Sequence, residues 1–179
     1  MPRSFALSEE EFNELMRLCR LYRREARKCM DAKAYLAACI LIGAALEADL
    51  LAMCDCFADE IPDRVIPKQK NGTPKPLINW TFYQRLRAAR SAGWLPAGLD
   101  LEDVWVHRKA RIGDYAEVVR QIRNLVHASC YITDFPKQRV TNKRMTICYE
   151  TLEIASDHLQ AKVHADLRAK MEAEQSEQP

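Results

Sequence analysis

Glycine, strand-like alternation and long apolar runs are all scarce in this sequence, and each scarcity narrows the choice of fold. Only 5 of the 179 residues are glycine, which argues against an all-β fold with many tight turns. No alternation of apolar and polar residues is long enough to predict a β-strand. No run of about 18 apolar residues occurs, so we expect no transmembrane helix. The N-terminus lacks the apolar region of a signal peptide, and we therefore expect a cytoplasmic protein.

Sequence patterns that would indicate a bound metal or cofactor are missing as well. The cysteines number seven, an odd count, and Cys54 and Cys56 are too close together for a zinc knuckle. His158 and His164 are six residues apart, which does not place them as a metal pair on a helix. There is no phosphate-binding loop, nucleophile elbow or dinucleotide-binding glycine pattern. We therefore expect a reduced protein with no metal site and no cofactor.

Apolar residues at helical spacing, by contrast, recur along most of the chain. The length fits one domain of ordinary size with a buried core. The spacing predicts an all-α fold, an antiparallel bundle of four to five main helices. We assign residues 1–170 to this single domain and residues 171–179 to a frayed polar tail. The expected main helices cover about residues 9–30, 32–56, 80–92, 114–128 and 142–170.

Capping residues can be assigned to most of these helices. Ser8, with Glu11 three residues later, has the pattern of a capping box. Gly93 suits the position just after a helix end, where glycine is favoured. The other N-cap candidates are Asp31 for the second helix, Asn79 for the third, and Thr141 or Asn142 for the last.

The second expected helix is apolar nearly all round, as is typical of the most buried helix in a domain. Its centre reads YLAACILIGAALEADLLAM and contains Glu47. A buried carboxylate without a partner is very costly. We therefore expect Glu47 to pair with a guanidinium from the helix that contains Arg120, and Arg120 itself is one candidate.

The segment RQIRNLVHASCY, residues 120–131, carries the most informative polar pattern in the chain. In a helix, Arg120, Arg123 and His127 would share one face, and Asn124 would border it. We call these four residues the Arg/His stripe. Val118, Val119, Ile122, Leu125 and Val126 would bury the opposite face. Such a stripe requires either acidic partners inside the protein or a phosphate, and the spacing alone leaves both alternatives open.

The uneven charge of the chain bears on that choice. Residues 61–145 carry 16 Lys and Arg against 7 Asp and Glu, a net charge of +9, whereas the whole chain has a net charge of +2. A positive region around the stripe suits a phosphate-bearing partner. A solvated basic surface without a partner would have the same composition.

Histidine and arginine together suffice for metal-independent RNA cleavage. Histidine moves protons near neutral pH, and arginine binds a phosphate and stabilises its developing charge. The imidazole would activate the 2′-hydroxyl of the RNA or protonate the leaving 5′-oxygen. No other motif in the chain indicates a competing chemistry.

The apolar helix ILIGAALEADLL, followed later by R…RNLVHASCY, resembles the HEPN superfamily of all-α domains in prokaryotic toxins and abortive-infection proteins. The resemblance covers about residues 32–159. It implies a metal-independent endoribonuclease of defence type, acting on RNA as a homodimer with one composite site. Arg123-Asn124 matches the family dipeptide with three residues before His127, whereas Arg120 matches the family spacing with six. Catalytic roles therefore fall to Arg123, His127 and Arg120, with Asn124 and Glu47 in support.

Two other function classes remain open from the sequence. A HEPN-like fold could bind RNA or a nucleotide, or dimerise, without cleaving. The stripe could also form ion pairs at an interface within a larger complex. In toxin members of the superfamily an antitoxin modifies a tyrosine two residues after the histidine. Ser129 stands there in this chain and Tyr131 follows, so an antitoxin or regulatory protein is a further partner to consider, but that modification is not expected.

Overall fold

The computed structural model describes residues 5–95, 127, 132 and 140–176. Within these residues there is no β-strand, only an isolated bridge between Lys68 and Pro74. The prediction of an all-α fold is confirmed. The α-helices of the described residues are α1 (Glu9–Asp31), α2 (Tyr35–Cys56), α3 (Phe82–Ser91) and α6 (Asn142–Ser176), and the 3-10 turns are η1 (Ala58–Glu60), η2 (Asp63–Val65) and η3 (Leu77–Asn79).

Helix α1 begins at the predicted capping box. The backbone N–H of Glu11 donates to Ser8 Oγ at 3.2 Å, and the Ser8 N–H donates to Glu11 Oε2 at 2.8 Å. Two N–H groups that have no partner within a helix end are satisfied in this way. The prediction for this helix start is confirmed.

The turn between α1 and α2 is closed by backbone bonds rather than by a side chain. The Lys33 N–H donates to Met30 O at 3.0 Å, and the Ala34 N–H donates to Cys29 O at 2.8 Å. Lys33 has a φ of 58°, a left-handed conformation that is uncommon for a residue with a Cβ. The prediction that Asp31 caps α2 is wrong, because Asp31 is still the last residue of α1 and the N-cap is Ala34.

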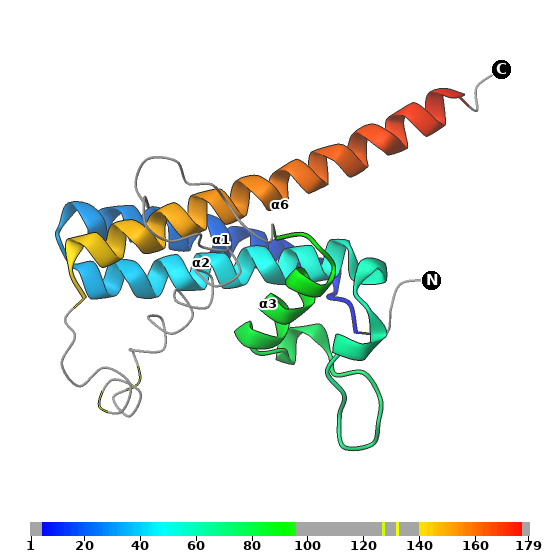
Figure 1. The fold of residues 1–179 in the computed structure, drawn as a ribbon, viewed down its shortest axis with the longest axis horizontal. Coiled ribbons are helices and arrows are strands. Elements are labelled where there is room, and N and C mark those ends of the chain that lie inside the picture. Colours follow the sequence, from blue (N-terminus) through cyan, green and yellow to red (C-terminus); the bar gives the residue numbers. More distant parts are fainter. Residues whose placement is uncertain (1–4, 96–126, 128–131, 133–139, 177–179) are drawn as a thin grey trace, which may run out of the picture.

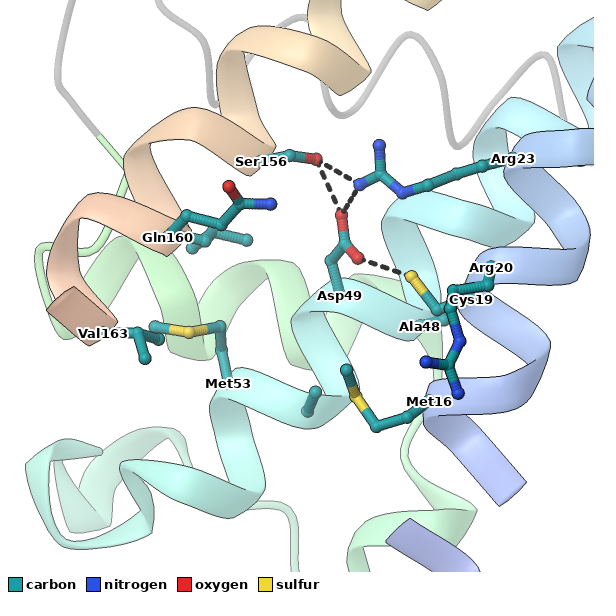
Figure 2. Close-up of a pocket in the computed structure, with 12 residues that line it drawn as sticks. Met16, Cys19, Arg20, Arg23, Ala48, Asp49, Met53, Ser156, Gln160 and Val163 are labelled. Atoms are coloured by element: carbon teal, nitrogen blue, oxygen red, sulfur yellow. Dashed lines mark hydrogen bonds and ion pairs between the residues drawn. The ribbon is translucent and has the colours of Figure 1, made fainter. Parts of the chain in front are cut away.

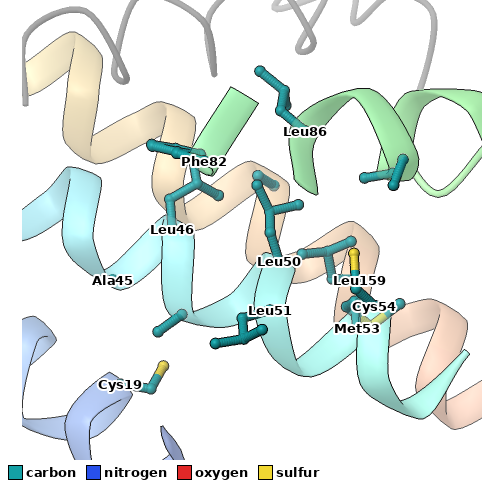
Figure 3. Packing of buried hydrophobic residues seen from close by; sticks show 14 of the residues in the cluster. Cys19, Ala45, Leu46, Leu50, Leu51, Met53, Cys54, Phe82, Leu86 and Leu159 are labelled. Atoms are coloured by element: carbon teal, nitrogen blue, oxygen red, sulfur yellow. The ribbon is translucent and has the colours of Figure 1, made fainter. Parts of the chain in front are cut away.

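Helix α2 is the core of the described fold. It packs against α1, α3 and α6, and Figure 1 shows it between α6 on one side and α3 on the other. Ile42, Leu46 and Leu50 are fully buried, and Figure 3 shows Leu46 and Leu50 among side chains from the neighbouring helices. By length and composition alone α2 also fits a membrane span, a test that the buried core helix of a soluble protein passes too, so the expectation of no transmembrane helix stays a prediction.

Helix α6 runs parallel to α2 and antiparallel to α1. Asp49 of α2 contacts Ser156, and Lys162 lies over the ring of Phe57, just after α2 ends. The Arg144 N–H donates to Thr141 Oγ1 at 3.4 Å, as predicted for the start of this helix. The helix continues to Ser176, through most of the expected polar tail, and extends well past the other helices in Figure 1.

Helix α3 packs on α2 after a chain segment with little regular structure. Its N-cap is Thr81, whose Oγ1 accepts from the Gln84 N–H at 3.3 Å, so the prediction of Asn79 is wrong. Asn79 belongs to η3. Gly93 has a φ of 76°, as expected after a helix end. Residues 68–74 form an exposed loop tip, whose base is held by the Lys68–Pro74 bridge.

A single carboxylate joins three parts of the described fold. Glu60 of η1 accepts from Trp94 Nε1 at 2.8 Å and from Lys162 Nζ of α6 at 2.7 Å. Burial alone would raise the pKa of Glu60, but the bonds from Lys162 and Trp94 lower it below the usual value. Trp94 also packs against the ring of Phe57, with centroids 6.1 Å apart.

Candidate functional site

Most of the Arg/His stripe falls outside the described residues. Arg120, Arg123 and Asn124 belong to that part of the chain, and their positions relative to one another stay a prediction. His127 is described: it is exposed and lies in a bend, where we expected the last turn of a helix. Helix ends commonly differ from expectation by one or two residues. Its exposure leaves the imidazole open to solvent.

Glu47 has the guanidinium partner that its burial requires, and one such partner is Arg85 of α3. Arg85 Nη1 lies 2.6 Å from Glu47 Oε1, and the two side chains are 6% and 18% exposed. Arg85 Nη2 also donates to Ile78 O at 3.3 Å. The predicted partner was a guanidinium from the helix that contains Arg120, and Arg85 was not considered. A contact between Glu47 and Arg120 lies outside the described residues.

A signal for Arg85 was present in the sequence. Phe82, Leu86 and Ala89 are buried and recur at helical spacing, and Arg85 lies on the same face of α3. An arginine within an apolar helix face needs a buried acid, and Glu47 is one of two acids in the apolar stretch of α2. The pair fixes α3 on α2.

The second acid of α2, Asp49, is the centre of a polar cluster that the sequence analysis did not anticipate. Asp49 Oδ2 accepts from Arg23 Nη2 at 2.5 Å and from Ser156 Oγ at 2.7 Å, and its Oδ1 accepts from Cys19 Sγ at 2.9 Å. Figure 2 shows these four side chains converging from three helices. The Asp49 cluster, made of Asp49, Arg23, Ser156 and Cys19, therefore connects α1 and α6 across α2.

The protonation of the Asp49 cluster follows from its surroundings. Burial, and then the Asp49 carboxylate, raise the pKa of Cys19 to about 11. Burial alone would lower the pKa of Arg23, but Asp49 and Cys19 more than offset it, so the pKa of Arg23 is raised. The thiol thus stays protonated near neutral pH, and it is a hydrogen-bond donor rather than a nucleophile.

Next to the Asp49 cluster lies a groove of about 340 Å³ between α1 and α6, with α2 as its floor. Its lining is largely apolar and includes Met16 of α1, Met53 of α2 and Val163 of α6, which Figure 2 labels. We call it the α1–α6 groove. A groove between two helices over an apolar floor has the shape that an amphipathic helix occupies in many complexes.

Basic side chains form one rim of the α1–α6 groove. Arg24 and Lys28 contact Glu25 of the same helix. Within the part of the chain that the structure describes, Arg20 and Arg27 are exposed and have no acidic partner. This basic edge consists of Arg20, Arg23, Arg24, Arg27 and Lys28, which together with Asp31 line a second hollow on α1. Arg20 and Arg23 line both this hollow and the α1–α6 groove.

No group of three or more histidine, cysteine, aspartate or glutamate side chains that could hold a metal ion occurs among the described residues. His158 and His164, both on α6, belong to no such group.

Comparison of the chain with protein-family models, with curated proteins and with solved structures finds no match. The described residues thus offer two features for functional argument: an exposed histidine from the predicted stripe, and a groove with a basic edge.

Proposed function

We propose that the chain is a metal-independent endoribonuclease of HEPN type, which acts in cytoplasmic defence as a homodimer. The observation that carries the proposal is the exposure of His127, because proton transfer to or from RNA requires an imidazole that the substrate can reach. The all-α fold and the positive charge of residues 61–145 are consistent with it.

In the proposed reaction the RNA supplies its own nucleophile. The 2′-oxygen attacks the adjacent phosphorus and loses its proton to a base, while the bond from phosphorus to the 5′-oxygen breaks and that oxygen gains a proton. His127 serves as one of these proton carriers, and Arg123 or Arg120 binds the phosphate and stabilises its charge. The products are a 2′,3′-cyclic phosphate and a 5′-hydroxyl.

Glu47 has a supporting role in this proposal. Its pairing with Arg85 holds α3 against α2, the central helix of the described fold. It is a positioning residue within the scaffold and does not carry protons.

The test is cleavage of RNA by the purified full chain in the presence of EDTA. We expect cleavage to fall by about 10²–10⁴-fold in His127→Ala, in the range for loss of general acid–base assistance. His158→Ala is the matched control, because His158 is a histidine of α6 outside the motif. Salt-dependent RNA binding without cleavage would support the alternative, a non-cleaving binding module. Equal activity in wild type and His127→Ala would refute the assigned role of His127.

A further inference from the structure

The part of α6 beyond the other helices presents exposed apolar side chains. Leu167 is 52% exposed and Met171 is 60% exposed. They are four residues apart, as are Val163 and Leu167, so the three lie along one helix face. We call residues 164–176 the α6 extension. Figure 1 shows this extension projecting away from α1, α2 and α3.

We propose that the α6 extension of a second copy of this chain docks in the α1–α6 groove, and that the exchange is reciprocal. Val163 belongs to both features: it lines the groove and it begins the apolar face of the extension. Apolar side chains therefore follow one face of α6 from Leu159 through Val163 to Met171; this face lines the groove up to Val163 and projects beyond it. When two α6 helices cross antiparallel near this residue, the protruding half of each enters the hollow half of the other. This gives a closed, twofold-symmetric dimer.

Charge complementarity favours this occupant over an unrelated apolar peptide. The last eight residues, EAEQSEQP, contain three glutamates and no lysine or arginine. In the antiparallel arrangement each residue after Val163 lies opposite the residue equally far before it, so residues 164–170 follow the groove to Ser156 and the acidic end begins just beyond. Because α1 is antiparallel to α6, the same path leads from Met16 towards Arg20 and the rest of the basic edge. Opposite charges at a rim select register and partner.

The inference goes beyond the proposed nuclease function, because it assigns an interface and requires no cleavage. A monomeric wild type would overturn both this interface and the homodimer of the proposed function. Loss of the interface in a chain that still dimerises would overturn this inference alone, and the RNA assay tests cleavage separately.

The first test measures self-association of the full chain by sedimentation equilibrium. We expect wild type to dimerise, and the Leu167→Glu/Met171→Glu variant to dimerise at least about 100-fold more weakly, because the docked face would carry two buried charges. Ala165→Glu/Ala169→Glu is the matched control. It adds the same charge to the same exposed segment, on the opposite side of the helix, since two residues correspond to about 200° of rotation. Circular dichroism confirms that both variants keep their helix content.

The result is decisive in each direction. Dimerisation of wild type and of the alanine-site variant, with loss in the Leu167/Met171 variant, supports the interface. A wild type that stays monomeric, a Leu167/Met171 variant that associates as tightly as wild type, or equal weakening in both variants would overturn it.

The second test reverses the charges at the rim. Arg20→Glu/Arg27→Glu changes two exposed arginines without an acidic partner among the described residues, and we expect it to weaken dimerisation about tenfold at low salt. Replacing Glu172, Glu174 and Glu177 by lysine should have a similar effect. Combining the arginine-to-glutamate and glutamate-to-lysine substitutions in one chain should restore dimerisation, because the two surfaces again carry opposite charges. Failure of the combined variant to recover would refute the docking of the acidic end on the basic edge.

Discussion

At the scale of single residues, two of the three acids of α2 show how the position of a residue in a helix determines which neighbouring helix it contacts. Glu47 and Asp49 are two residues apart, which corresponds to about 200° around the helix. Glu47 accordingly contacts Arg85 of α3, whereas Asp49 contacts Arg23 of α1 and Ser156 of α6. One short stretch of sequence therefore fixes neighbours on opposite sides of the core helix.

The Glu47–Arg85 pair yields a prediction about stability. Arg85→Met alone leaves a carboxylate with its buried partner removed, and we expect a loss of about 3–5 kcal/mol in the free energy of unfolding. The double variant Glu47→Leu/Arg85→Met should lose much less than the sum of its single variants, because neither charge remains. Chemical denaturation measures all three. Arg87→Met, at an exposed position of the same helix, serves as the control and should change stability by no more than about 0.5 kcal/mol. Additive losses would contradict the pairing.

The Asp49 cluster yields a prediction about alkaline pH. Burial and the Asp49 carboxylate raise the pKa of Cys19 from its ordinary value of 9.0 to about 11 in the folded protein. A raised pKa contributes stability that is fully present below pH 9 and is lost as pH rises towards 11, because the unfolded thiol ionises first. Wild type should therefore lose stability more steeply than Cys19→Ala across this interval. Denaturant midpoints at several pH values measure the difference, and parallel curves would count against the assignment.

At this scale the sequence showed that a buried acid needs a cationic partner, but it did not show which residue is that partner. The apolar surroundings of Glu47 required a guanidinium, and the structure supplies Arg85. The choice among arginines depended on how helices far apart in sequence pack, which periodicity does not encode. Asp49 carried the same signal as Glu47 and was overlooked.

At the scale of elements, the turn between α1 and α2 stores a small conformational cost. Lys33 has a φ of 58°, where a Cβ is disfavoured and glycine is not. We expect Lys33→Gly to stabilise the protein by about 0.5–1 kcal/mol, with the gain reduced by the greater freedom of glycine in the unfolded chain. Lys33→Ala keeps the Cβ and is the control, for which no such gain is expected. Thermal melts of the three proteins provide the comparison, and destabilisation by glycine would disprove this reading of the turn.

The start of α1 was predicted from a complete capping pattern, whereas the equally complete pattern of Thr81 and Gln84 was overlooked. Ser8 and Glu11 form a capping box in the sequence and in the structure. Asp31 and Asn79 were chosen for their side chains alone, and both are wrong: α2 starts after a turn closed by backbone bonds, and α3 starts at a capping box of Thr81 and Gln84. A cap residue followed three positions later by glutamate or glutamine marked the helix start in both capping boxes, whereas a suitable cap residue alone did not.

At the scale of the whole molecule, the burial of α2 predicts how substitutions along this helix change stability, and this tests whether α2 is the core helix. Leu46 is fully buried, whereas Leu36 of the same helix is 38% exposed. In aqueous buffer we expect Leu46→Ala to cost about 2–5 kcal/mol and Leu36→Ala to cost much less. Both values come from chemical denaturation without detergent. A chain that requires detergent to remain in solution, or two variants of equal stability, would contradict α2 as the core helix of a water-soluble bundle.

The all-α class was accessible from the sequence because helical periodicity is a local property that repeats along the chain. The candidate site was accessible only in part. Its motif residues Arg120, Arg123 and Asn124 lie outside the described residues, and His127 alone is placed. The α1–α6 groove could not be read from the sequence at all, because it arises where helices from opposite ends of the chain meet.

The loop tip at residues 68–74 is a suitable site for inserting a label. Its two ends are joined by the Lys68–Pro74 bridge, and none of its residues is buried. Insertions are best tolerated where backbone is exposed and uninvolved in packing. A fluorescent label or affinity epitope grafted there would report on the intact protein while leaving its termini unmodified.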